Sequence, residues 1–275
     1  MMTRLLFASA VLCGGIALAQ NPPPLINPTG AGASPAAAQQ RRALSDNSSA
    51  DDVLDALDAR GRNLREFVAD VRLKEIDEAT QLESERTGRV WYQKEAGDDS
   101  RIRVVFDQKL EGRFAKPEKV EYLLDDGWLV DRDYRRTVQV KRQVLRPGEK
   151  INLLKLGEGP FPLPIGQPKE QVHREFEVTK GGLVDGDPKG TVHVTLKPRK
   201  GTRLAEKFNV IDVWVDPKTN MPVRIEVLDV NETTRRQTDL TNIKVNPEPR
   251  LGDRDFALPN IDENKWEMHT EPFND

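Results

Sequence analysis

The chain has 275 residues, of which 37% are hydrophobic and 32% are charged, and its formal net charge is -3. This length suits a single domain once terminal tails are set aside. The negative net charge disfavours a nucleic-acid-binding protein that is held by contacts to phosphates. Three histidines and one cysteine leave little material for a metal cluster.

The first nineteen residues have the pattern of a secretory signal peptide. Arg4 supplies a positive charge ahead of the apolar run Leu5–Leu18, and the small residues that end at Ala19 form a cleavage site. The apolar run is too short and too interrupted by glycine for a good membrane span, so a retained anchor helix is the weaker alternative. Cys13 lies inside this segment, and cleavage therefore predicts an exported chain without disulfides.

Residues 20–49 are rich in Pro, Ala, Gln, Asn and Ser and have almost no large apolar residues, which predicts a disordered tether. Structure is expected to begin at Ser49, which can cap a helix whose first turn is acidic. Apolar residues then recur near helical spacing. They predict a short amphipathic helix over residues 51–60, ended by Gly61.

From Leu64 onward the hydrophobic period is two, which is typical of half-buried strands. Asp126-Gly127 is the strongest hairpin signal, because both turn positions need positive φ, and Phe208–Val230 reads as a second hairpin. Strands joined by short turns indicate an antiparallel meander. The apolar residues expected on one face are Phe67, Val71, Val90, Tyr92, Ile102, Val104, Phe106, Tyr122, Leu124, Trp128, Val138, Val140, Val213, Val215, Val223 and Ile225.

Residues 145–168 break the alternation with prolines and glycines, yet they remain apolar. Phe161, Leu163 and Ile165 alternate with prolines that hold the stretch extended, so the three side chains are expected to project to one side. This pattern predicts a lid over the apolar face of the sheet. A packing loop without a further role is the alternative.

No catalytic motif is present in the sequence. His173, His193 and His269 lie far apart without a second ligand at metal spacing, so each is expected to be solvated or satisfied by neighbours. There is no nucleophile elbow and no phosphate loop. A glycosidase with paired carboxylates is the remaining enzymatic alternative. The sequence therefore predicts a protein that is not an enzyme and that holds no cofactor or metal.

The order of several short motifs resembles the LolA-like proteins, which are periplasmic carriers of lipoproteins to the outer membrane. Leu123–Asp131 contains a Leu-x-x-Asp-Gly-aromatic turn and leads to the strand at Val138–Val140. Three further stretches are similar to the family's second and third strands, its return hairpin and its closing Phe-x-x-Pro: Gly88–Trp91 with Arg101–Val104, Asp216–Pro222, and Asp255–Pro259. The resemblance covers Asp51 to Pro259.

The resemblance implies a mainly β (α+β) fold, in which a strongly curved antiparallel sheet forms an incomplete β-barrel with a short N-terminal helix and a lid segment. The domain would span residues 50–260, and a polar tail would follow over 261–275. The resemblance also implies a hydrophobic cavity for acyl chains, lined by the alternating residues and closed by the lid. An arginine tethers the lid in the family, and Arg103 is the best match, with Arg89 and Arg101 as other candidates.

The function implied is that of a monomeric periplasmic carrier for an acylated protein or a lipid, with inner-membrane donor and outer-membrane acceptor proteins as partners. A sensor or protein-interaction module on the same half-barrel is the alternative, and a secreted hydrolase is a weaker one. A filled core is the alternative to the cavity, because interior residues alternate in either case. Co-purified lipid would favour the carrier, and a dry, filled interior would favour the interaction module.

Overall fold

The computed structural model describes residues 43–94, 99–112, 114–146, 148–149, 153–154 and 165–273. The expected signal peptide, most of the expected tether, and the lid residues Phe161 and Leu163 lie outside the described residues. Residues Leu44–Asp275 form one compact unit. No helix in the described part of the chain is long and apolar enough to cross a membrane.

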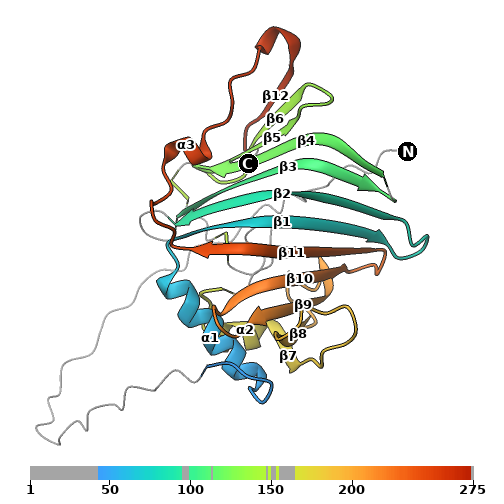
Figure 1. Cartoon of the computed structure of the whole chain (residues 1–275), viewed down its shortest axis with the longest axis vertical. Coiled ribbons are helices and arrows are strands. Elements are labelled where there is room, and N and C mark those ends of the chain that lie inside the picture. Colours follow the sequence, from blue (N-terminus) through green and yellow to red (C-terminus); the bar gives the residue numbers. More distant parts are fainter. Residues whose placement is uncertain are drawn as a thin grey trace, which may run out of the picture. The chain divides into compact units, whose positions relative to one another are not determined.

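Twelve strands of the described residues form one sheet, in the order β12-β6-β5-β4-β3-β2-β1-β11-β10-β9-β8-β7 (Figure 1). The strands are β1 (Glu66–Asp77), β2 (Glu83–Lys94), β3 (Ser100–Glu111), β4 (Phe114–Asp125), β5 (Trp128–Asp133), β6 (Val138–Gln143), β7 (Phe176–Lys180), β8 (Val192–Pro198), β9 (Phe208–Asp216), β10 (Met221–Asp229), β11 (Thr234–Val245) and β12 (Glu267–Glu271). The expected fold is confirmed: the sheet is strongly curved and open, as in an incomplete barrel.

Two antiparallel meanders build this sheet. Strands β1 to β6 follow one another on one side, β7 to β11 follow one another on the other, and the pairing of β1 with β11 joins them. The Asp126-Gly127 turn has positive φ at both residues, 47° and 73°, which confirms the expected hairpin between β4 and β5. Asn220 has φ of 53° and ends the turn between β9 and β10.

Four short helices accompany the sheet in the described residues: α1 (Ala50–Asn63), α2 (Lys169–Glu175), α3 (Asp253–Phe256) and the 3-10 helix η1 (Glu263–Lys265). Ser49 caps α1 as expected, and it forms a capping box with Asp52. The helix continues past Gly61 instead of ending there. Glycine is required at position 61 for another reason: two backbones approach closely there, and a Cβ on Gly61 would lie 2.2 Å from the Cα atom of Gly166.

We call the side of the sheet that packs against α1 the inner face, and the opposite side the outer face. Val53, Leu54 and Leu57 of α1 are at most 1% exposed, and they belong to one cluster with inner-face side chains from β1, β2, β3 and β7 to β11. Each such side chain contributes about 1.5–3 kcal/mol when fully buried. The main core therefore lies between the sheet and α1.

A second, smaller cluster lies on the outer face. Phe256, which is 3% exposed, packs with Leu123 and Val130, and Trp91, Leu251 and Leu258 surround these three residues. Residues 249–273, which we call the C-terminal segment, include α3 and η1 and end in β12. In Figure 1 this segment runs from α3 past the end of β6 and returns as β12.

Within the expected polar tail over residues 261–275, Glu267–Glu271 forms β12 and pairs in parallel with β6. All five side chains of β12 are exposed, so no apolar alternation marks this strand in the sequence. Strand β7 and helix α2 also lack a clear periodic signal because both are short.

The contact between α1 and Gly166 gives a first prediction. Replacing a helical glycine by alanine usually stabilises a helix by about 1 kcal/mol. In Gly61→Ala the new methyl group meets the Gly166 backbone, which cannot rotate away. We expect a net loss of about 1–3 kcal/mol in the free energy of unfolding, measured by chemical denaturation.

Gly182→Ala is the matched control, because a Cβ there has no atom within 4 Å and its φ is not positive. Its unfolding free energy is expected to stay within about 0.5 kcal/mol of that of the original chain. Equal stability of both variants would contradict the close approach of α1 and Gly166.

Candidate functional site

The structure brings most of the predicted cavity residues together on the inner face. They are at most 6% exposed and belong to the main core with α1: Phe67, Val71, Val90, Tyr92, Ile102, Val104, Phe106, Leu124, Ile165, Val213, Val215 and Ile225. Tyr122 packs against this cluster and meets Phe106 edge-on, with 6.4 Å between the ring centroids. The apolar surface therefore extends across both meanders.

Two predicted residues lie elsewhere. Trp128 pairs with Asp125, one position before Leu124 in the hairpin register, so its side chain belongs to the outer face. There it lies 4.6 Å below the ammonium group of Lys141. Val223 stands at a bulge of β10, which interrupts the alternation, and it borders a groove on the outer face. The correction for Trp128 arises because alternation within a strand does not say which face is which, and that for Val223 arises because the bulge breaks the alternation.

Residues outside α1 also cover the inner face. Leu153 and Leu154 are 1% and 4% exposed, and the backbone N–H of Leu153 donates to the Ser100 hydroxyl at 3.1 Å. Val172 of α2 and Ile165 complete the described part of this cover. Over the described residues the interior next to α1 is thus packed, as expected for the filled-core alternative.

The inner face is less fully covered at β5 and β6. Val138 and Val140 are half-buried and lie opposite Asp133 and Asp131 in the β5–β6 register. Burial raises the pKa of Asp131 to about 6, the charge of Asp133 adds to this, and nearby arginines oppose it. This end of the inner face combines apolar side chains with a carboxyl group that titrates near neutral pH.

Arg103 does not tether a lid on the inner face. It alternates with Ile102 and therefore lies on the outer face, where its Nε donates to Glu121 Oε1 at 2.7 Å. Its Nη1 donates to the backbone carbonyl of Asp255 at 2.9 Å. Arg132 likewise donates to the carbonyl of Pro259 at 2.6 Å. These arginines hold the C-terminal segment.

The other two arginine candidates also lie on the outer face. Arg101 donates to Asp253 at 2.9 Å and stands 4.2 Å above the ring of Phe256, so it too contacts the C-terminal segment. Arg89 pairs with Asp70 at 3.1 Å on the exposed surface of β1 and β2.

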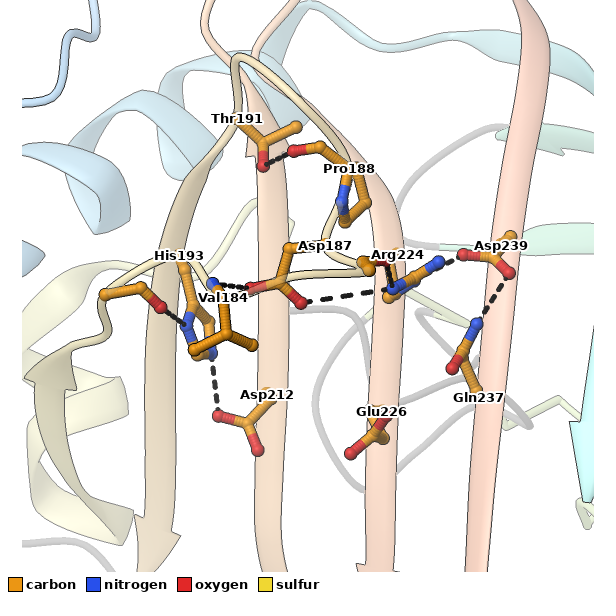
Figure 2. A network of polar contacts seen from close by, with 12 residues as sticks. Val184, Asp187, Pro188, Thr191, His193, Asp212, Arg224, Glu226, Gln237 and Asp239 are labelled. Carbon is orange, nitrogen blue, oxygen red and sulfur yellow. Dashed lines mark hydrogen bonds and ion pairs between the residues drawn. The ribbon is translucent and has the colours of Figure 1, made fainter. Parts of the chain in front are cut away.

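A polar network covers the outer face of β8 to β11 (Figure 2). Arg224 donates from Nε to Asp239 Oδ1 at 2.6 Å and from Nη1 to the carbonyl of Gly186 at 2.9 Å. Arg72 donates to the other oxygen of Asp239 at 2.7 Å. Burial disfavours the ionised form of Asp239, but hydrogen bonds from Arg224, Gln237 and Arg72 outweigh it and lower the pKa of that carboxyl. The network thus holds the loop at Gly186 against the sheet.

His193 anchors the other end of the same loop. Its ring stacks on Trp214, with centroids 4.3 Å apart, and Nε2 lies 2.8 Å from Asp212 Oδ1. Nδ1 lies 3.1 Å from the carbonyl oxygen of Gly182. Both partners only accept hydrogen bonds, so the doubly protonated imidazolium satisfies this geometry best. Burial opposes the charge, but the hydrogen bonds to Asp212 and Gly182 raise the pKa of His193 above its ordinary value.

Between this loop and the meander of β1 to β3, the outer face is hollowed into a groove of about 980 Å³. Its lining carries charges of both signs and one indole: Arg72, Arg89, Trp91, Asp107, Arg224 and Asp239. Within the described ranges no group of three His, Cys, Asp or Glu side chains could hold a metal ion.

Thr195, His193 and Asp212 form an arrangement that superficially suggests a catalytic triad. The Thr195 hydroxyl donates to Asp212 at 2.5 Å, and His193 contacts the same carboxylate oxygen. A triad needs the hydroxyl to donate to the imidazole and the imidazole to the carboxylate. Here the carboxylate receives both groups, so the arrangement clamps strands and loop together and does not activate a nucleophile.

The chain was compared with family models, curated protein sequences and solved structures. Neither a family model nor a curated protein sequence matches this chain. Similar solved structures include an uncharacterized conserved protein from Thermus thermophilus, with 13% identity, a TM-score of 0.46, and coverage of 81% of this chain and 99% of that chain. Another is the MucA/MucB complex of Pseudomonas aeruginosa, with 16% identity, a TM-score of 0.42, and coverage of 76% of this chain and 61% of that chain.

A LolA superfamily protein from Nitrosomonas europaea is also similar, with 10% identity, a TM-score of 0.34, and coverage of 77% of this chain and 98% of that chain. At these identities and TM-scores the likeness carries no argument about function. What this chain binds has to follow from its own residues.

The His193 clamp gives a second prediction, on pH dependence. Because the pKa of His193 is raised in the folded protein, its stabilising effect is complete below about pH 6.5 and is lost as the pH rises through the folded pKa. We expect His193→Gln to lower the free energy of unfolding by about 1–3 kcal/mol at pH 6, and by less at pH 9.

The measurement is chemical denaturation at both pH values, with His269→Gln as the control, because His269 contacts only the exposed Glu267 of its own strand. A destabilisation by His193→Gln that grows with pH would contradict the imidazolium assignment.

Proposed function

We propose that this chain is a periplasmic carrier or chaperone, not an enzyme, which shelters an acyl chain of a lipoprotein or lipid on its way to the outer membrane. The observation that carries the proposal is the continuous apolar inner face, which is closed by helices and loop residues and not by a second sheet. Apolar side chains extend over both meanders, while α1, α2 and a few residues between β6 and α2 provide the described cover. An extended apolar surface under such a cover suits a guest that enters and leaves.

The attachments of the cover support this proposal. Lys169 of α2 pairs with Asp55 of α1 at 2.8 Å, and His173 contacts Asp51 at 2.8 Å. These exposed pairs bind the two helices to each other, and each contributes about 0–1 kcal/mol. Helix α1 reaches the sheet through Arg60, which donates to the carbonyl of Thr219 at 2.7 Å. Because these polar attachments are weak, α1 could move away from the sheet, whereas α2 continues directly into β7.

Energetics allow such a movement. Each buried methylene of a guest contributes about 0.8 kcal/mol, so one long acyl chain could replace the contacts that α1 makes with the sheet. We propose that the acyl chain enters at β4 to β6, where Tyr122, Val138 and Val140 are less completely covered than the side chains beside α1. Asp131 and Arg142 border this entry and would contact the polar end of the guest.

A protein-interaction module is the second candidate function, and a specific observation favours it. The described interior beside α1 is packed, and the groove on the outer face offers charges of both signs together with Trp91. In that case the sheet would be a rigid support, and a partner protein would bind to its outer face.

Lipid extraction separates the two candidates and gives a third prediction. The purified full chain is extracted with organic solvent, and the extract is analysed by mass spectrometry. We expect acyl lipid at a substantial fraction of one equivalent, because a guest buried in the sheet leaves slowly. Lipid-free protein that also fails to take up a fluorescent fatty acid would support the interaction module instead.

The entry at β6 is tested with a matched pair of variants in the fatty-acid assay. Val140→Gln places an amide on the inner face, and Lys141→Gln makes a similar change on the outer face of the same strand. We expect Val140→Gln to weaken binding about tenfold while the melting temperature moves by only a few degrees, because Val140 is half-buried. Equal affinities of the two variants would exclude an entry at β6.

A further inference from the structure

Strand β12 is attached to the sheet without burying any of its own side chains. It pairs in parallel with β6 from Glu267 to Glu271, and all five of its residues are exposed. Each of the other strands has at least one residue that is not fully exposed. Because packing makes no demand on the side chains of β12, the backbone ladder holds it in place, and many sequences could form the same ladder.

The side-chain contacts at the ends of β12 are few and superficial. Arg142 Nε pairs with Glu271 Oε2 at 2.6 Å on the surface. Trp266 meets Tyr134 edge-on, with 5.1 Å between the ring centroids, and Arg146 stands 5.3 Å above the ring of Phe273. Contacts of these kinds at exposed or half-exposed positions stabilise a fold only weakly. The strand is therefore bound weakly compared with the rest of the sheet.

Charge complementarity characterises this contact. The strand β6 and its flanks carry five basic residues: Arg135, Arg136, Lys141, Arg142 and Arg146. The stretch Asp262–Phe273, whose residues 267–271 pair with β6, contains four carboxylate residues and one lysine. A basic edge strand thus holds an acidic extended segment.

The fold does not depend on β12. Phe256 is buried upstream in the outer-face cluster, and Arg103 and Arg132 hold the carbonyls of Asp255 and Pro259. These anchors keep residues 249–260 in place whether or not β12 is paired. Departure of β12 would leave β6 as a bare edge whose backbone groups can pair with another chain.

We propose that the edge of β6 is a docking site for an acidic extended segment of a partner protein, which takes the place of β12. The chain's own residues 262–273 are the resident occupant, and a partner displaces them by adding a parallel strand to the sheet. The proposal goes beyond the carrier function and does not rest on it, because a docked strand pairs with the backbone groups of β6 and needs no guest on the inner face.

The test uses the chain's own segment as the probe. A variant that ends at Ile261 is mixed with a fluorescently labelled peptide of residues 262–273, and binding is followed by fluorescence anisotropy. We expect saturable binding to the shortened chain and at least tenfold weaker binding to the full chain, whose own β12 competes. Raising the salt concentration should weaken binding, because the contacts are exposed ion pairs.

Two controls separate strand pairing from simple attraction of charges. A peptide with His269→Pro keeps every carboxylate but loses a backbone N–H in the middle of β12, so it should not bind. In the shortened chain, Arg142→Gln should weaken binding several-fold, whereas Lys197→Gln on β8 should leave it unchanged. Equal binding of the original and His269→Pro peptides would overturn the docking site.

The full chain provides the same test without shortening. His269→Pro within the full chain should loosen β12 and allow the labelled peptide to bind, while circular dichroism stays that of the original chain. If neither the shortened chain nor this variant binds the peptide, the proposal is wrong. If the opened edge instead pairs two copies of the chain into a dimer that excludes the peptide, the occupant is a second copy and the assignment to a partner protein is overturned.

Discussion

Apolar contact between α1 and the inner face of the sheet is the interaction on which the other features depend. The β1–β11 pairing joins two meanders into one surface, and the stacked rings of Phe67 and Tyr92, 5.3 Å apart, lie near the junction. An open sheet has no second sheet to keep its apolar face dry. Helix α1 does this with Val53, Leu54 and Leu57. The same contact would have to loosen for a guest to reach the inner face.

The outer face follows a different physical rule. Several of its arginines pair with carboxylates on neighbouring strands, and some of them also donate to backbone carbonyls of loops. Arg224 holds the loop at Gly186, and Arg103 holds the C-terminal segment at Asp255. Such hydrogen bonds from charged groups are directional, whereas apolar burial is not. The outer face therefore fixes where loops lie, while the inner face provides most of the stabilisation.

This division separates two kinds of binding surface. The inner face is apolar and closed by α1, so access to it depends on movement of the cover. The groove on the outer face is exposed and charged, whereas the edge of β6 is paired with β12, so access to that edge would need displacement of β12. The carrier function that we propose would use both kinds of surface, and in this chain they lie on opposite sides or edges of one sheet.

The sequence by itself determined the local structure: the alternation of Ile102, Val104 and Phe106, the cap at Ser49 and the turn at Asp126-Gly127 each act within a few residues. Only the tertiary structure decided which side chains of each strand point to the inner face and which to the outer face. It placed Trp128 and Arg103 on the outer face. It also decided the use of Gly61 and the pairing of β12 with β6. The physical reason is the distance along the chain over which each feature is encoded. The hydrophobic period and the turn type depend on adjacent residues, whereas the direction of a strand face, the close approach of two backbones and the pairing of an edge strand depend on residues far apart in the chain.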